Sequence, residues 1–169
     1  NKGGDFRKWY GNFDYVINWE NGGYELRNFK NAAIRNPNYY FEPHVTWSKV
    51  SISKVAFRYR PVGSVFSDAG WAATFHDVLW YALGLLNTKY AQRVFDIINP
   101  TVNYTQSTIA NLPYIVNAAK KEIITETVKK NVFVTQNDWD SFETSWDFKK
   151  HPLLRNVSTI SEAFTQWQA

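Results

Sequence analysis

The sequence contains no cysteine and no methionine, and it has no long hydrophobic run. The lack of cysteine excludes a disulfide framework, a thiolate metal site and a cysteine nucleophile, and it suits a reducing compartment. The longest apolar run, residues 78–86, is far shorter than the roughly 20 residues of a membrane-spanning helix. We therefore predict a cytoplasmic protein with no membrane partner. Because methionine is missing even at position 1, we expect a piece of a longer polypeptide.

Catalytic motifs are scarce as well. The three histidines, His44, His76 and His151, are far apart and have no carboxylate at a metal-ligand spacing. No Gly-x-Ser-x-Gly nucleophile elbow occurs, and residues 147–149 (DFK) resemble only half of a nuclease metal site. The sequence thus predicts no catalytic residue, no metal site and no cofactor in this chain.

Residues 111–114 (NLPY) resemble the Asn-Pro-Pro-Tyr tetrapeptide with which adenine methyltransferases hold a flipped base. Leucine replaces the first proline here, and no Gly-x-Gly loop follows a strand to receive the methyl donor. We therefore interpret this tetrapeptide as a helix-terminating turn.

Positive charge is concentrated in the first third of the chain. The net charge is +4, and residues 1–60 carry ten Lys and Arg against five Asp and Glu, while the remaining residues are close to balance. A local surplus of this kind attracts polyanions because binding releases their counterions.

Residues 2–12 (KGGDFRKWYGN) are the most informative stretch within this basic third. Two glycines let the backbone approach a ligand closely, and Arg7, Lys8, Trp9 and Tyr10 are residue types that grip phosphates and stack on bases. These features predict a nucleic-acid loop. The alternative is a flexible start to the domain, with aromatic side chains that fold into its core.

The fold class predicted from hydrophobic periodicity is α/β (α+β). Short runs rich in β-branched and aromatic residues predict strands at 15–19, 39–41, 45–51, 55–59 and 65–66. Turn sequences separate these runs, so we expect an antiparallel or mixed sheet within residues 13–75.

Helical spacing follows the strands. We predict helices at 78–86 and 88–98, the second with Thr88 as its N-cap, and a further helix at 117–132. Another helix is expected after Thr135, and a short one after the capping box of Thr159 and Glu162. The predicted domains are a recognition unit at 1–116, with strands in 13–75 and helices in 77–99, and a helical segment at 117–169 packed on it.

Two arginines of the strand predicted at 55–59 and just after it are candidates for reading bases. Arg58 and Arg60 alternate with Phe57 and Tyr59, so they project from the opposite face of the strand. We expect both to present guanidinium groups to guanine edges; the alternative is a solvated strand face with no ligand.

Several segments, in order and spacing, resemble the C-terminal part of PglX-type adenine-specific DNA methyltransferases. They are residues 2–12, 45–48 (VTWS), 84–89 (GLLNTK), 99–104 (NPTVNY), 109–113 (IANLP) and 138–148 (DWDSFETSWDF). The first and last of these are the most specific. Proteins of this family are bacterial phage-defence proteins, and this part is similar to the target-recognition domain of restriction-modification enzymes.

The resemblance implies a division of labour. A catalytic domain outside this chain, N-terminal to it, is expected to bind S-adenosylmethionine and methylate adenine, while this domain chooses the sequence of double-stranded DNA. Other phage-defence subunits are possible further partners. The candidate DNA-binding residues are Lys2, Arg7, Lys8, Trp9, Tyr10, Thr46, Ser48, Lys49, Lys54, Arg58 and Arg60.

Two other function classes stay open. Eight tryptophans are compatible with a carbohydrate-binding module, because sugar rings stack on exposed indoles, although most such residues belong to cores. A scaffold that packs on partner subunits through its C-terminal helices is the third option. Salt-dependent binding to a heparin resin separates DNA binding from sugar binding, and co-purification tests the scaffold.

Overall fold

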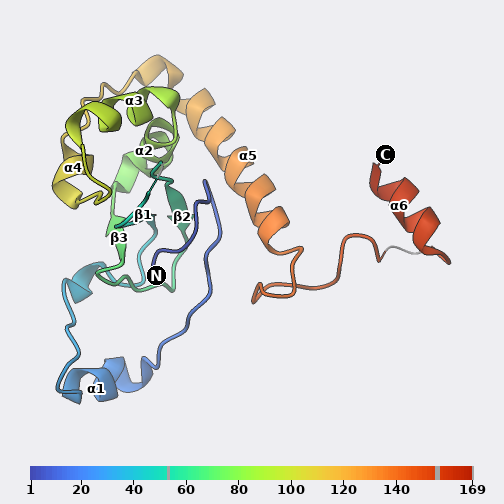
Figure 1. Cartoon of the computed structure of the whole chain (residues 1–169), viewed down its shortest axis with the longest axis horizontal. Helices are drawn as coiled ribbons and strands as arrows, with labels where there is room; N and C mark the ends of the chain where they lie inside the picture. Colours follow the sequence, from blue (N-terminus) through green and yellow to red (C-terminus); the bar gives the residue numbers. More distant parts are fainter. Residues whose placement is uncertain (53, 155–156, 169) are drawn as a thin grey trace.

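A small antiparallel sheet lies at the centre of the computed structural model, which describes residues 1–52, 54–154 and 157–168. Its strands are β1 (His44–Ser48), β2 (Arg58–Arg60) and β3 (Gly70–Ala73), in the order β2-β1-β3 (Figure 1). Val45 of β1 pairs with Tyr59 of β2 and with Ala73 of β3. The predicted α/β class with an antiparallel sheet is confirmed. Strand β3 was not among the predicted strands.

One face of the sheet carries the hydrophobic core. Val45 and Trp47 alternate along β1 and are fully buried with Phe57, Leu83 and Phe95. The Trp47 indole also donates a hydrogen bond to the Tyr104 carbonyl at 2.8 Å. Burial of these large side chains supplies the main driving force for folding.

Two consecutive helices pack in this core, as predicted. They are α2 (Leu79–Leu86), preceded by a 3-10 turn at His76–Val78, and α3 (Lys89–Ile98). The Thr88 hydroxyl accepts a hydrogen bond from the Ala91 amide at 3.1 Å, which confirms the predicted N-cap. A short helix, α4 (Gln106–Ala110), follows α3, and its bounds were not predicted.

The helix α5 (Lys121–Trp139) crosses α2 closely. A Cβ atom on Gly84 of α2 would lie 2.7 Å from Val128 Cγ2, so glycine allows the two helices to approach. The 3-10 turn Ala118–Lys120 begins the segment, with Asn117 as its cap. We expected one helix to end at residue 132 and a second to begin after Thr135. This prediction is wrong, because α5 continues through both positions. Val128, Val132 and Trp139 continue one buried face, and no glycine or proline interrupts it.

Residues 15–41 form an arm that projects from the body (Figure 1). We predicted strands at 15–19, 39–41 and 65–66, but the arm contains α1 (Glu20–Asn28) and a 3-10 turn at Pro37–Tyr39, and none of those residues joins the sheet. The aromatic residues that favoured strands pack on one another instead. Trp19 lies 5.4 Å from Tyr40, and Tyr40 lies 4.9 Å from Phe66, between ring centroids.

The described chain ends in α6 (Ile160–Gln168), which lies apart from the body in Figure 1. The Thr159 hydroxyl accepts from the Glu162 amide, and the Glu162 carboxylate accepts from the Thr159 amide, both at 3.2 Å. The predicted capping box is confirmed. None of the helices in the described residues has the length and apolar character needed to cross a membrane. The domain boundary at residue 116 stays a prediction.

Candidate nucleic-acid interface

The glycine-rich loop at residues 2–12 covers the face of the sheet opposite the core. Trp9 inserts beside β2, where its amide donates to the Phe57 carbonyl at 2.9 Å and its carbonyl accepts from the Tyr59 amide at 2.7 Å. Farther along the sheet, the Ser48 hydroxyl donates to the Gly4 carbonyl at 2.8 Å. This loop therefore has a structural role as a cover of the sheet.

Glycine at position 11 is required by the packing of this loop. Gly11 has φ of +118°, which is strained for residues with a side chain, and a Cβ there would lie 2.9 Å from Trp139 Cε3 and against the Arg7 side chain. The chain can thus bring the loop directly onto the C-terminal end of α5.

The two segments with the most specific resemblance are in contact with each other. Arg7 of the loop pairs with Asp138 at 2.9 Å, and its guanidinium lies 5.1 Å from the centre of the Trp139 ring. The Trp146 indole donates to the Phe13 carbonyl at 2.7 Å. Residues 2–12 and 138–148 consequently form one structural unit that holds α5 against the sheet.

Arg58 and Arg60 lie beneath this loop and are almost fully covered. Their exposed fractions are 1% and 2%, and burial lowers the pKa of each guanidinium to about 10. Arg58 donates to the Arg7 carbonyl, and Arg60 to the Asn12 carbonyl. Our expectation that both guanidinium groups face outward was therefore wrong. A period-two pattern separates the two faces of a strand, but it does not show that a loop distant in sequence covers one of them.

Other predicted site residues are also engaged in the fold. Thr46 is buried and donates to the Trp71 carbonyl at 2.7 Å. Lys8 donates to the Asn87 carbonyl at 3.0 Å, and Lys49 pairs with Asp68 at the same distance. That hydrogen bond lowers the pKa of the Asp68 carboxyl.

The remaining predicted residues differ in exposure. Tyr10 is buried, which raises the pKa of its hydroxyl to about 12, with a smaller contribution from Asp140. Trp9 and Ser48 are half-buried, and Lys2 and Lys54 are exposed. Whether any of these residues contacts DNA stays a prediction.

The arm carries basic residues that the predicted site did not include. Lys30 and Arg35 are exposed, and Arg35 lies close enough to Asp68 to contribute to its lowered pKa. Arg27 is exposed too, but it donates to the Gly22 carbonyl at 2.9 Å. The charge count of the first 60 residues included all three. We did not place them on a projecting arm, because we predicted strands in this segment.

A groove of about 820 Å³ runs between the base of the arm and the sheet, and we call it the arm groove. Lys2 and Arg60 line it together with aromatic residues that include Tyr15, Trp19 and Trp146. The Lys2 ammonium lies 4.4 Å from the centre of the Tyr15 ring. The arm groove thus combines positive charge with flat aromatic surfaces.

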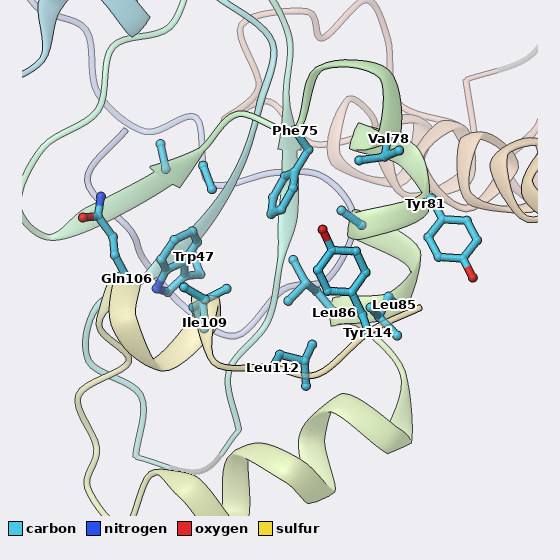
Figure 2. Close-up of a pocket in the computed structure, with 14 residues that line it drawn as sticks. Trp47, Phe75, Val78, Tyr81, Leu85, Leu86, Gln106, Ile109, Leu112 and Tyr114 are labelled. Atoms are coloured by element: carbon cyan, nitrogen blue, oxygen red, sulfur yellow. The ribbon is translucent and has the colours of Figure 1, made fainter. Parts of the chain in front are cut away.

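A second cavity, of about 410 Å³, is mostly apolar (Figure 2). Figure 2 shows Trp47, Phe75 and Tyr114 around it. Tyr114 belongs to the NLPY segment, in which Leu112 is buried and Asn111 ends α4. The interpretation of this segment as a helix-terminating turn is confirmed. In the described part of the chain, no cluster of three or more histidine, aspartate or glutamate side chains is placed to hold a metal ion.

His44 makes the stability of the fold depend on pH. Its Nδ1 lies 2.8 Å from the Glu42 carbonyl and therefore carries the proton, while Nε2 is buried without a partner. Burial lowers the pKa of His44 from 6.5 to about 4. Between these values the unfolded chain binds a proton that the folded chain does not, so stability falls as the pH decreases through this window.

We expect His44→Asn, which retains a donor near Glu42 but cannot titrate, to reduce this dependence. Between pH 7 and pH 4.5 the unmodified chain should lose about 2 kcal/mol more unfolding free energy than the variant. Urea unfolding at the two pH values measures the difference. If the unmodified chain and the variant lose the same unfolding free energy, His44 does not cause the pH dependence.

Two known proteins that are similar to this chain are both adenine-specific methyltransferases. It is 35% identical, over 98% of its length, to the adenine-specific methyltransferase BrxX of Escherichia coli O9:H4 (strain HS). It is 34% identical, over 99% of its length, to the adenine-specific methyltransferase PglX of Lacticaseibacillus casei (strain Zhang). The chain spans only 14% and 15% of these relatives. No family model matches. The resemblance to a part of PglX-type proteins is confirmed.

Proposed function

We propose that this chain, which matches a segment of PglX-type adenine-specific methyltransferases, is a DNA-recognition domain of such an enzyme and is not catalytic by itself. Two adenine-specific methyltransferases match this chain over nearly its whole length. The structural observation that carries the proposal is the projecting arm with its exposed basic side chains. Such groups fix a protein on the phosphates of DNA.

The complete protein has a second part in this proposal. The remainder of the polypeptide binds S-adenosylmethionine and transfers its methyl group to adenine, while this segment selects the site on double-stranded DNA. The enzyme acts in the bacterial cytoplasm, where other phage-defence subunits are candidate partners. Sequence selection in the major groove needs side chains that reach base edges from a fixed register on the backbone.

We place the proposed contacts with the DNA backbone on exposed basic residues, Lys2 of the loop at residues 2–12 and Lys30 and Arg35 of the arm. Lys2, Lys30 and Arg35 are exposed, and the described residues provide no ion-pair partner for any of them. By contrast, Arg58 and Arg60 are covered, and Arg7 and Lys49 are already paired.

Binding of duplex DNA at several salt concentrations tests this proposal. If Lys2, Lys30 and Arg35 each neutralise one phosphate, the logarithm of the binding constant should fall with the logarithm of salt with a slope near −3. Replacing all three with alanine should remove most of that slope. The measurement is fluorescence anisotropy of a labelled duplex.

A matched control removes the same charge elsewhere. Lys89, Lys120 and Lys130 are exposed and lie outside the arm. Their triple alanine variant should retain a slope close to that of the unmodified chain. If both triple variants lose the slope equally, DNA is attracted only by net charge and the arm is not the interface.

A further inference from the structure

Arg58 and Arg60 are two buried cations on one face of the sheet with no carboxylate within ion-pair distance. The charge of Asp14 acts on both, but it offsets only part of the burial that lowers the pKa of each guanidinium. No ion pair involves either residue within the described residues. Their hydrogen-bond partners are neutral oxygens, those of the Arg7 and Asn12 carbonyls, the Ser48 hydroxyl and the Asn1 side-chain amide. Buried charges are normally paired, so this arrangement favours an anion nearby.

The second observation is an unused donor. The Nε atoms of Arg58 and Arg60 are buried and have no hydrogen-bond partner. Arg60 also lines the arm groove, together with Lys2. The groove therefore offers an anion one buried guanidinium and one exposed ammonium, and the Asp68 carboxylate that also lines it is paired with Lys49.

Aromatic surfaces form the rest of the groove. The Phe13 ring is stacked on the Arg60 guanidinium, with its centre 3.7 Å from Cζ, and it lines the groove with Tyr15, Trp19 and Trp146. Aromatic side chains beside a positive site are the usual surface for an unstacked base and its phosphate. An acidic peptide would match the two cations but would leave the aromatic walls unused.

We propose that the arm groove binds one nucleotide of a DNA strand, with its phosphate on Lys2 and Arg60 and its base against the aromatic walls. This inference rests on the proposed function and deepens it, because it assigns to the chain a site for a nucleotide displaced from the base stack. Removing a base from the stack costs energy, and a site that stacks the base again offsets that cost. A volume of about 820 Å³ lies in the range of small-molecule sites.

Nuclear magnetic resonance on the complete 169-residue chain tests the assignment. The probes are dAMP, deoxyadenosine and inorganic phosphate, and the reporters are the Arg60 Nε–H and the Trp146 indole signals. We expect dAMP to shift both signals, and each of the other two probes to bind at least tenfold more weakly. A single-stranded hexanucleotide should displace dAMP, since the site serves a DNA strand.

Two variants distinguish binding of dAMP in the arm groove from attraction of dAMP by the net positive charge of the chain. Lys2→Ala should weaken dAMP binding at least fivefold, whereas Lys130→Ala, which removes the same charge from α5, should leave it unchanged. The proposal is overturned if neither reporter shifts with dAMP, if phosphate binds as tightly as dAMP, or if the hexanucleotide fails to compete. If dAMP does not bind but duplex DNA binds normally, only the nucleotide site in the arm groove is refuted. If dAMP binds but duplex DNA does not, the proposed function is refuted.

Discussion

Gly11→Ala should lower the free energy of unfolding by about 2–5 kcal/mol. The positive φ of +118° costs about 1–3 kcal/mol for a residue with a side chain, and overpacking costs a similar amount. The added methyl group would meet the Arg7 side chain and lie 2.9 Å from Trp139 Cε3. Urea unfolding measures the loss, which reports on the contact between the loop and α5.

Gly63→Ala provides the matched control. Gly63 also has a positive φ, of +101°, but a Cβ there meets nothing within 4 Å. This variant should lose only the backbone part, about 1–3 kcal/mol, and therefore less than Gly11→Ala. If the two variants are equally destabilised, the loop and α5 are not tightly packed, and the structural unit that joins residues 2–12 to 138–148 would have to be abandoned.

Asn87→Ala should destabilise the chain by about 1–3 kcal/mol. Asn87 is buried after α2, where its amide nitrogen donates to the carbonyls of Phe57 at 2.9 Å and Leu83 at 3.2 Å. Its amide oxygen also accepts from the Phe57 amide at 3.2 Å. The substitution leaves the buried Phe57 amide without a partner, which costs about 1–3 kcal/mol. The Phe57 carbonyl loses one of its two donors and keeps the Trp9 amide.

Asn111→Ala is the control for this prediction, because Asn111 likewise follows a helix but is exposed. It should change stability by less than about 0.5 kcal/mol. Thermal unfolding of both variants compares them. A loss at position 87 no larger than at position 111 would mean that the Asn87 side chain does not join the helices to the sheet.

The helices α2, α3 and α6 could be predicted because their signals are local. The cap at Thr88, the end of α3 before Pro100 and the capping box of Thr159 and Glu162 depend on neighbouring residues only. The strands predicted in the arm were wrong because aromatic residues favour strands and also favour packing on one another. Trp19, Tyr40 and Phe66 pack together, and no period in the sequence distinguishes that outcome.

The candidate site shows a similar limit. The surplus of positive charge in the first 60 residues was visible in the sequence, but the number of those charges that reach solvent was not. Arg58 and Arg60 occupy the strand face opposite Phe57, as predicted, yet a loop from the start of the chain covers them. Contacts between residues about 50 positions apart, such as that of Arg58 with Arg7, leave no periodic signal.

Exchange of this segment between enzymes tests the recognition role most directly. In the Escherichia coli relative, the matching 14% of the protein would be replaced by this chain, and methylated adenines would be mapped in the host genome. If this chain selects the DNA site, the chimera should methylate a motif different from that of the unmodified relative, and the Lys2, Lys30 and Arg35 triple alanine variant should methylate the new motif less. A chimera that still methylates the relative's own motif would contradict the recognition role.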